Sequence, residues 1–494
     1  MTNIVRVLLL LAAAPILLAA SAGARAQEIV VALGAEPSTL DPQLQQDGAE
    51  RAVTDGIYET LLARDKDGNL VPGLASQMPT QIDTTTWEVK LRPNIKFQDG
   101  EPFNADAVVF SLRRIVDPAY GSRQMAYVAS IVGADKVDDL TVRIHTKGSD
   151  SVLLSRLYWV KIVPPQHAAE ANFSQTPVGT GPYKFVTWDK GARIVIVANP
   201  DYWGAKPQIQ KATFRFVSDS GARLAGLLAG EFDLTSNLSP DDVKRVPKYV
   251  DIKGIEHPFL IVNALTGVTA DKRVRQALNY AVDKEAIAKQ LYQGFARVDD
   301  GQTLSPSWFG YDPTLKAYPY DPAKARALLK EAGAEGSTIE LITPAGRWLN
   351  DREVCEAVAG YWQAVGIKVN LNIMDWPKYL ERIYDRTNRP QMIFVVNANQ
   401  LLHADRTLSD YYAKSGRGSS NDDDVLNDLI TRARAEPDMG KQKDLYHQAL
   451  ARTRDEAYFI FLVGSDILYG ESKRLDWSPG VDDRMLVKDM KVAN

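Results

Sequence analysis

The chain has 494 residues, which is more than one hydrophobic core usually serves, so we expect two or three domains. Its 45% hydrophobic and 24% charged residues are an ordinary globular composition, and 58 basic against 62 acidic residues leave a net charge of −4. This balance disfavours a nucleic-acid-binding protein. The single cysteine, Cys355, excludes an internal disulfide, and its position between Val354 and Val358 on an apolar helical face predicts a buried, inert thiol.

Residues 1–26 have the pattern of a secretory signal peptide. Arg6 precedes the apolar run VLLLLAAAPILLAA, and residues 24–26 (ARA) fit the small-x-small cleavage rule. We therefore expect cleavage after Ala26 and export to the periplasm. A retained membrane anchor is the alternative, but the run is short for a membrane span and Pro15 interrupts it.

Residues 84–118 predict a strand pair that leads into a helix. Trp87, Val89 and Leu91 alternate with charged residues, as in a strand with one buried face. Ile95 and Phe97 resume the alternation before the turn at 98–100, so we expect a hairpin. Residues 104–118 then change to helical spacing, with an Asn as N-cap and Asp-Pro as the stop.

Further elements alternate along the chain in a βα pattern. The spacing predicts strands over 28–33, 140–145, 212–217, 338–342, 367–373 and 458–463, and helices over 223–229, 321–332, 352–365, 421–436 and 440–452. Between them, residues 257–264 run extended and the pattern restarts over 271–287. The strand, helix and strand over 338–373 form a βαβ unit, whose strands should be parallel. The two glycines of Gly179-Thr180-Gly181 do not make a phosphate loop, because the third glycine and the Gly-Lys-Ser/Thr sequence are absent.

The residues of this strand and helix region carry a family resemblance. Trp87-x-Val-x-Leu-Arg92, Ile95-Lys-Phe97-x-Asp-Gly100-x-Pro-Phe103 and Asp106-x-Val108 closely resemble the signature of the peptide/nickel/oligopeptide class of ABC-transporter substrate-binding proteins, solute-binding protein family 5. Residues 34–42, 177–183 and 199–203 continue the resemblance.

The resemblance implies a fold and a division of the chain. The fold class is α/β, a two-lobed periplasmic binding protein (type II, cluster C-like) with a mixed sheet in each lobe and a two-strand hinge. The implied domains are the signal peptide 1–26, lobe I 27–262 with an inserted subdomain about 60–185, lobe II 263–463, and a return to lobe I at 464–494.

The resemblance also implies ligand-binding residues in a cleft between the lobes. In residues 343–348 (TPAGRW), Arg347 matches a carboxylate-binding arginine, and Trp348 follows it. Trp376 matches an aromatic residue that lines the cleft, with core packing as the alternative. Gln46 and Asp47 match first-lobe positions that touch the ligand.

One segment departs from the pattern of the peptide-binding relatives, which carry a Trp and then an Asp that pairs with the peptide ammonium group. Here Asn397 stands at the Trp and Gln400 at the Asp, with His403 in place of a second acid. An unpaired buried ammonium group is costly, so a standard peptide is doubtful. Asn397, Asn399 and Gln400 suit hydroxyls, amides or a carboxylated solute, although Asp405 could supply the acid after a shift of register. His403 suggests pH-sensitive recognition, with an ordinary loop histidine as the alternative.

The prediction is therefore a periplasmic receptor of an ABC importer that captures a peptide-like, opine-like or oligosaccharide-like solute and delivers it to a membrane permease. We expect a monomer that is not an enzyme, with no cofactor and no metal, because no two of the five histidines are spaced as metal ligands. Two alternatives stay open: a periplasmic hydrolase acting on a peptide or glycoside, and a chaperone or sensory receptor on the same fold.

Overall fold

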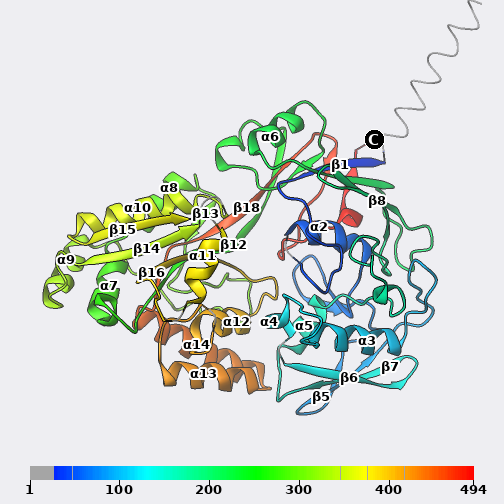
Figure 1. The fold of residues 1–494 in the computed structure, drawn as a ribbon, viewed down its shortest axis with the longest axis horizontal. Coiled ribbons are helices and arrows are strands. Elements are labelled where there is room, and N and C mark those ends of the chain that lie inside the picture. The colour runs from blue at the N-terminus through cyan, green and yellow to red at the C-terminus, as the bar shows by residue number, and fades with distance from the viewer. Residues whose placement is uncertain are drawn as a thin grey trace, which may run out of the picture.

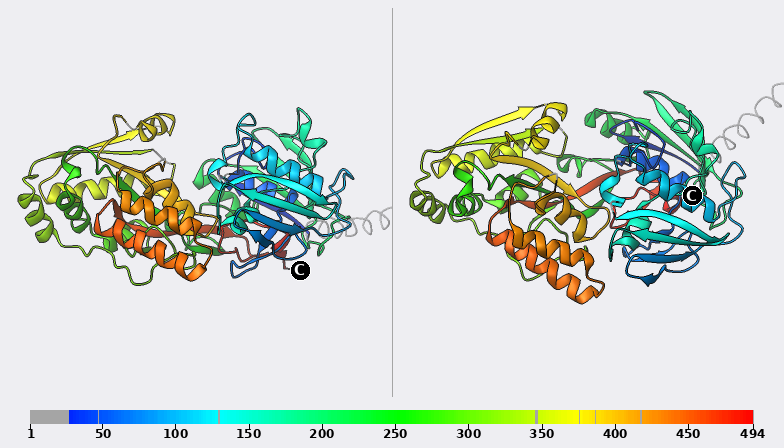
Figure 2. Two further views of the ribbon diagram at one scale, coloured as in Figure 1. Left: turned by 90° about the horizontal axis from the view of Figure 1, so that it is seen from below. Right: turned by 60° about the horizontal axis from the view of Figure 1, so that its bottom comes forward.

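The computed structural model describes residues 27–46, 48–128, 130–344, 347–374, 376–385, 387–416 and 418–493, so the expected signal peptide lies outside the described residues. The chain folds into two lobes that lie side by side (Figures 1 and 2). Two long strands, β12 (Lys248–Val262) and β18 (Val463–Glu471), run antiparallel to each other from one lobe to the other. They join the strands of both lobes into one mixed sheet.

Lobe I contains one end of this sheet. Its strands lie in the order β11, β1, β10, β9, β8, and β1 is parallel to both of its neighbours. The bounds are β1 Glu28–Leu33, β8 Tyr183–Asp189, β9 Arg193–Ala198, β10 Lys211–Phe216 and β11 Leu234–Thr235, with helices α2 Gly48–Ile57 and α6 Ser220–Leu228. The predicted alternation in the first strand is confirmed, because Ile29, Val31 and Leu33 all enter one hydrophobic core.

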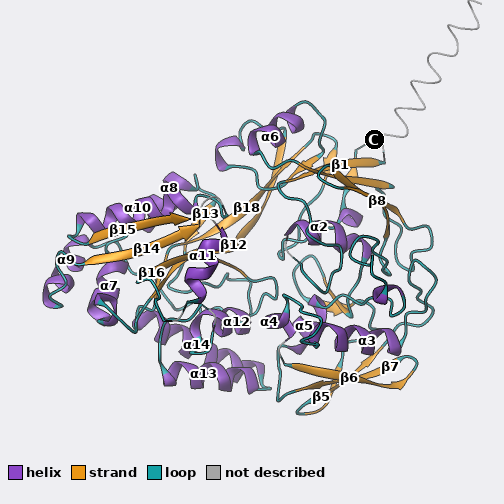
Figure 3. Cartoon of the chain, in the orientation of Figure 1, coloured by secondary structure: helices purple, strands orange, loops and turns teal. Residues whose placement is uncertain are grey.

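A subdomain is inserted into lobe I, and its small sheet lies at the outer edge of the molecule (Figure 3). The strands are antiparallel in the order β4 Thr80–Asp83, β5 Thr86–Lys90, β7 Thr141–Thr146 and β6 Ile131–Asp138, and the helices are α3 Ala105–Val116, α4 Met125–Val128 and α5 Leu153–Trp159. The apolar faces predicted from the sequence meet in its core, where Trp87 and Val89 of β5 join Val108 and Leu112 of α3. The Asn104 side chain caps α3 by accepting from Ala107 N.

The predicted hairpin turn at 98–100 is confirmed: Phe97 N donates to Glu101 O at 2.8 Å, and Phe103 N donates to Ile95 O at 3.0 Å. Ile95 and Phe97 are buried but do not pair with β5; instead Lys96 forms a bridge to Pro102 across a tight turn. Strand β5 pairs instead with β4, which precedes it, and with β7, which comes from much later in the chain. Alternation and the turn residues thus identified the buried side chains and the hairpin, whereas the pairing of β5 with β7 was not predicted.

Lobe II contains the other end of the sheet, in the order β15, β14, β16, β12. The bounds are β14 Thr338–Pro344, β15 Lys368–Met374, β16 Met392–Ala398, β13 Ala296–Val298 and β17 Phe459–Phe461. Strands β14 and β15 are parallel and joined by α10, which confirms the predicted βαβ unit. The helices are α7 Lys272–Tyr280, α8 Lys284–Leu291, α9 Pro322–Glu331, α10 Asp351–Ala364, α11 Trp376–Tyr384, α12 Ala404–Thr407, α13 Asp424–Ala435 and α14 Met439–Asp455.

The helices of lobe II cover both faces of its sheet. Leu260 and Val262 of β12 point to one core with α7 and α10, whereas Phe259 and Ile261 point to the other with α13 and α14. A strand buried on both faces is apolar at successive positions. Residues 271–287, where the pattern restarts, contain α7 and the start of α8, and Asp283 caps the second helix.

The crossing strand β12 contains a bulge between the lobes. The pairing register with β18 shifts between Ile252 and Glu256, and Gly254 takes a left-handed φ of 53°. Asp466 holds the bulge, because its carboxylate accepts from Gly254 N at 2.8 Å and pairs with Lys253 Nζ at 3.0 Å. A bulge changes the direction of the side chains that follow it, and the next side chain is that of Glu256.

Candidate functional site: a cavity between the lobes

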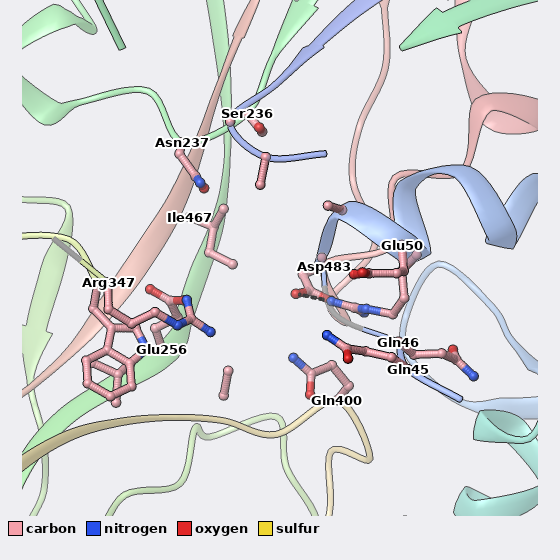
Figure 4. A pocket seen from close by; sticks show the side chains of 18 of the residues that line it. Gln45, Gln46, Glu50, Ser236, Asn237, Glu256, Arg347, Gln400, Ile467 and Asp483 are labelled. Atoms are coloured by element: carbon pink, nitrogen blue, oxygen red, sulfur yellow. Dashed lines mark hydrogen bonds and ion pairs between the residues drawn. The ribbon is translucent and has the colours of Figure 1, made fainter. Parts of the chain in front are cut away.

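A cavity of about 980 Å³ lies where the two lobes face each other. Residues of lobe I, lobe II, both crossing strands and the C-terminal segment line it, and Figure 4 shows the polar side chains that point into it. Ligand sites of small-molecule receptors have volumes of this order, and they are common at domain interfaces.

The lobe I wall presents charges that are already paired. Arg51 of α2 forms a two-point ion pair with Asp483 of the C-terminal segment, at 2.6 and 2.8 Å. Glu50 accepts from both the backbone N and the Oγ of Ser38 at 2.8 Å. These two carboxylates are therefore bound within the protein.

Gln46, a predicted contact, lines this wall and is buried. Its Nε2 donates to Trp159 O at 3.4 Å, whereas its Oε1 receives no hydrogen bond from the part of the chain that the structure describes. An unsatisfied buried carbonyl oxygen in a cavity is available to a ligand donor. Asp47, its predicted neighbour, lies outside the described residues.

The lobe II wall carries the predicted arginine and tryptophan. Arg347 is exposed to the cavity, and its guanidinium group lies 5.6 Å from the centre of the Trp348 ring. Trp348 is fixed by edge contacts with Tyr379 and Phe394 at 6.1 and 6.0 Å. The backbone N of Arg347 donates to Asp351 at 2.8 Å, which fixes the loop after β14. Trp376 begins α11, and its side chain is not among those described.

Glu256 lines the cavity from the crossing strand β12, and Figure 4 shows its carboxylate beside the Arg347 guanidinium group. Burial raises the pKa of Glu256 to about 7; Asp483 adds to this rise and Arg347 opposes it. None of the described residues donates a hydrogen bond to this carboxylate. Glu256 is thus a half-buried acid whose hydrogen-bonding capacity the protein leaves unused.

Gln400 lines the cavity at the junction of the lobes. Its Oε1 accepts from Tyr127 OH of lobe I at 3.3 Å, and the Arg406 guanidinium group lies 4.7 Å from the Tyr127 ring centre. The position that resembles the ammonium-binding acid of peptide-binding relatives thus contributes an amide to the cavity.

Four predicted site residues do not line this cavity. The Asn397 amide donates to Thr303 O and Thr407 Oγ1, and the Asn399 amide donates to His403 O and to the same Thr407 hydroxyl. Both asparagines are buried; Asn397 lies in β16 and Asn399 directly after this strand. Their amide nitrogens are thus bonded within the protein, whereas the Asn397 Oδ1 is buried without a hydrogen-bond partner among the described residues.

His403 and Asp405 are buried in the segment that follows. His403 Nδ1 accepts from Asp405 N as the N-cap of α12, and its ring stacks on Phe309 at 4.7 Å. Burial lowers the pKa of His403 to about 4, although Asp405 opposes the shift, so the ring stays neutral between pH 5 and 8. The pH-sensitive role suggested by the sequence has no basis in this position.

Asp405 joins the two lobes away from the cavity. Its carboxylate binds Arg156 of α5 in lobe I at 3.0 Å and Arg434 of α13 at 2.8 Å, and Arg156 also binds Asp150 at 2.9 Å. The Arg434 and Arg156 charges hold the pKa of Asp405 below its usual value despite burial. The contact closes one edge of the interlobe space in this conformation.

A Ser-His-Asp row lies behind Glu256, on the other face of β12. His257 Nδ1 is 2.9 Å from Asp299 Oδ1, and His257 Nε2 is 2.9 Å from Ser305 Oγ. The Ser305 hydroxyl donates to Gly254 O, so His257 Nε2 is left to donate to Ser305, the reverse of the direction that a catalytic base needs. All three residues are buried. The row ties the bulge to lobe II.

Other chemistry finds little support in the structure. Within the described ranges, no group of three or more His, Cys, Asp or Glu residues is arranged to hold a metal ion. Cys355 is buried in the core, and burial raises the pKa of its thiol far above the usual value. None of the described helices has the length and apolar character to span a bilayer.

The family model for bacterial extracellular solute-binding proteins, family 5, matches residues 69–419. The chain belongs to this family. Its members are the substrate-binding components of ABC importers, and the chain is accordingly the solute receptor of such an importer. The predicted family and fold class are confirmed.

Individual relatives extend over nearly the whole chain. The glutathione-binding protein GsiB of Pectobacterium atrosepticum is 29% identical over 91% of this chain and 91% of its own length. The dipeptide-binding protein of Escherichia coli is 30% identical over 90% of this chain and 91% of its own. The structure of NikA from Brucella suis in complex with Fe(III)-EDTA matches with a TM-score of 0.86, at 24% identity over 94% of this chain and 100% of that one.

Three residues that line the cavity were not predicted from the sequence, namely Glu256, Arg51 and Asp483. Glu256 lies in an extended apolar run, and only the bulge before it turns its side chain into the cavity. Arg51 and Asp483 are separated by most of the chain, so no local pattern could have paired them.

Proposed function

We propose that the chain is a periplasmic receptor that captures a peptide-like or other carboxylated small solute between its lobes and delivers it to a membrane permease. The observation that carries this proposal is the cavity of about 980 Å³, which takes its lining from both lobes and from both crossing strands. A solute bound there touches every part that must move when the lobes close, so its binding energy favours the closed form.

The chemistry of the cavity supports a polar, charged solute. Arg347 offers a guanidinium group suited to a carboxylate, Trp348 an aromatic face, and Gln46 and Gln400 offer amides. Relatives are named for glutathione and for dipeptides, which are carboxylated solutes of this kind. We infer that Arg347 and Trp348 are the main lobe II contacts and that Gln46 is a lobe I contact.

The bound solute can be identified by denaturing the purified protein and analysing the released small molecules by mass spectrometry. We expect a carboxylated solute at close to one molecule per chain. Release of uncharged sugars only would contradict the proposal.

We further propose that the protein acts as a monomer and returns its solute unchanged. Ser305 resembles a nucleophile only in spacing, because its proton is directed to Gly254 O. Incubation with the released solute should yield no product, and a Ser305→Ala variant should behave like the wild type. Turnover that disappears in this variant would instead establish the hydrolase alternative.

A further inference from the structure

We propose that Glu256 and Arg347 together bind one α-amino-acid head group, in which a single carbon carries both an ammonium and a carboxylate. This inference rests on the proposed function and specifies the class of solute. The carboxylate would lie on the Arg347 guanidinium group and the ammonium on the Glu256 carboxylate.

The first observation is that the two side chains lie next to each other. Glu256 comes from the crossing strand β12 and Arg347 from the loop after β14, and their charged ends lie near each other at one side of the cavity (Figure 4). The Arg347 charge reaches Glu256, since it lowers the pKa of Glu256 against the effect of burial.

The second observation is that Glu256 differs from the other acids at the cavity centre. Asp483 is bound to Arg51 through both carboxylate oxygens, and Glu50 accepts two hydrogen bonds from Ser38 on Oε1. The Glu256 oxygens receive no hydrogen bond from the described residues. A buried carboxylate without donors is costly, and a ligand ammonium group supplies up to three N–H donors.

The third observation concerns the distance between the ligand charges. In an extended dipeptide the carbons that bear the ammonium and the carboxylate are about 3.8 Å apart, and in longer peptides the separation increases. An α-amino-acid head group carries both on one carbon. Adjacent acceptor and donor side chains fit the head group better than the two ends of a peptide.

The fourth observation is the amide at Gln400, which accepts from Tyr127 and offers no negative charge. Glu256 is therefore an acid beside Arg347 that can pair with a cation. The cavity is larger than a free amino acid needs, and Gln46 and Gln400 line the remainder. The class of solute that fits is an amino acid conjugated through its side chain, as in a γ-glutamyl compound.

The test is isothermal titration calorimetry of the full mature chain with three probes. γ-Glutamylglycine carries the intact head group, glutarylglycine lacks its ammonium, and α-glutamylglycine is an isomer with the carboxylate moved from the α-carbon. We expect γ-glutamylglycine to bind about 30-fold more tightly than either of the others, the factor that corresponds to loss of a buried charge pair.

The Glu256→Gln variant tests whether the ligand ammonium pairs with the Glu256 carboxylate, because it removes the charge and keeps the size of the side chain. It should bind γ-glutamylglycine about 30-fold more weakly than the wild type and glutarylglycine equally well. Glu285→Gln, an exposed acid of α8, is the matched control and should leave all three affinities unchanged. Thermal melting of each variant checks that the fold is intact.

Equal affinity of the wild type for γ-glutamylglycine and glutarylglycine would overturn the head-group proposal. So would a solute released from the purified protein that lacks such a head group, although the receptor function would then stand. A protein that neither binds a probe nor releases any solute would overturn the receptor function itself.

Discussion

At the scale of single residues, the cavity is defined by which charges the protein satisfies internally. Arg51 and Asp483 form an ion pair with each other, and Glu50 accepts hydrogen bonds from Ser38. Glu256 receives no hydrogen bond from the described residues. Asn399 and His403 bond to neighbouring residues instead of lining the cavity. The Asn397 amide nitrogen also bonds within the protein, although its Oδ1 has no hydrogen-bond partner among the described residues. A polar residue can therefore be assigned to a ligand site only when its hydrogen-bond partners within the protein are known.

Replacing Arg347 by Ala should weaken the binding of a carboxylated solute by about 2–5 kcal/mol, because a buried charge pair loses one partner. Calorimetry with the solute released from the wild type measures the change. Arg352→Ala, an exposed residue paired with Glu356 on α10, serves as control. Unchanged affinity in Arg347→Ala would remove this residue from the site.

The raised pKa of Glu256 has a consequence for ligand-free stability. Its pKa rises from 4.5 to about 7 on folding, so the folded state binds more protons between these values. The contribution of this group to stability is present below about pH 4.5 and is lost as the pH rises through about 7. The melting temperature of Glu256→Gln relative to the wild type should therefore increase from pH 5 to pH 8, as measured by calorimetry. A difference that stays constant with pH would contradict the shift.

At the scale of elements, the bulge in β12 directs the side chains around the hinge. It leaves residues 253–255 out of the ladder, turns Glu256 toward the cavity and places His257 on the opposite face, where Asp299 and Ser305 hold it. Gly254 makes this possible, since a left-handed φ strains any residue with a Cβ.

Gly254→Ala should lower the free energy of unfolding by about 1–2 kcal/mol, because the left-handed conformation costs that much in a residue with a side chain. Urea denaturation measures the change. The matched control is Gly360→Ala in the exposed interior of α10, where an added Cβ meets nothing within 4 Å and helix propensity predicts a gain of up to about 1 kcal/mol. Equal effects of the two substitutions would show that the bulge is not strained.

At the scale of the whole molecule, closure depends on contacts at both edges of the interlobe space. The solute contributes from the cavity, and the buried Asp405 pair with Arg156 contributes where α5 of lobe I meets α12 of lobe II. A shift from mostly open to mostly closed requires roughly 5 kcal/mol of preference for the closed form. The protein contacts supply part of this preference and the solute the rest.

Asp405→Asn should open the ligand-free molecule, since removing one partner of a buried pair costs about 3–5 kcal/mol. The radius of gyration from small-angle scattering should increase and should fall again on addition of solute. Asp428→Asn, from an exposed pair with Arg432, should leave the radius unchanged. An unchanged radius in Asp405→Asn would mean that this contact does not hold the lobes together.

The sequence by itself determined the elements and the family. Alternation and capping predicted β1, α3 and the βαβ unit of lobe II, because a strand or helix buries a face whose period is local. The string of residues around Trp87 indicated the substrate-binding fold, and the family comparison confirmed it.

Only the tertiary structure decided which residues face the cavity. Glu256 is turned into it by a bulge that no local pattern marks, and Asp405 is withdrawn from it by an arginine 249 positions away in the chain. Strand partners also came from distant segments, as when β5 paired with β7, which lies much later in the chain. Period and propensity are properties of neighbouring residues, whereas a ligand site is formed by residues that the chain brings together only when the lobes are folded.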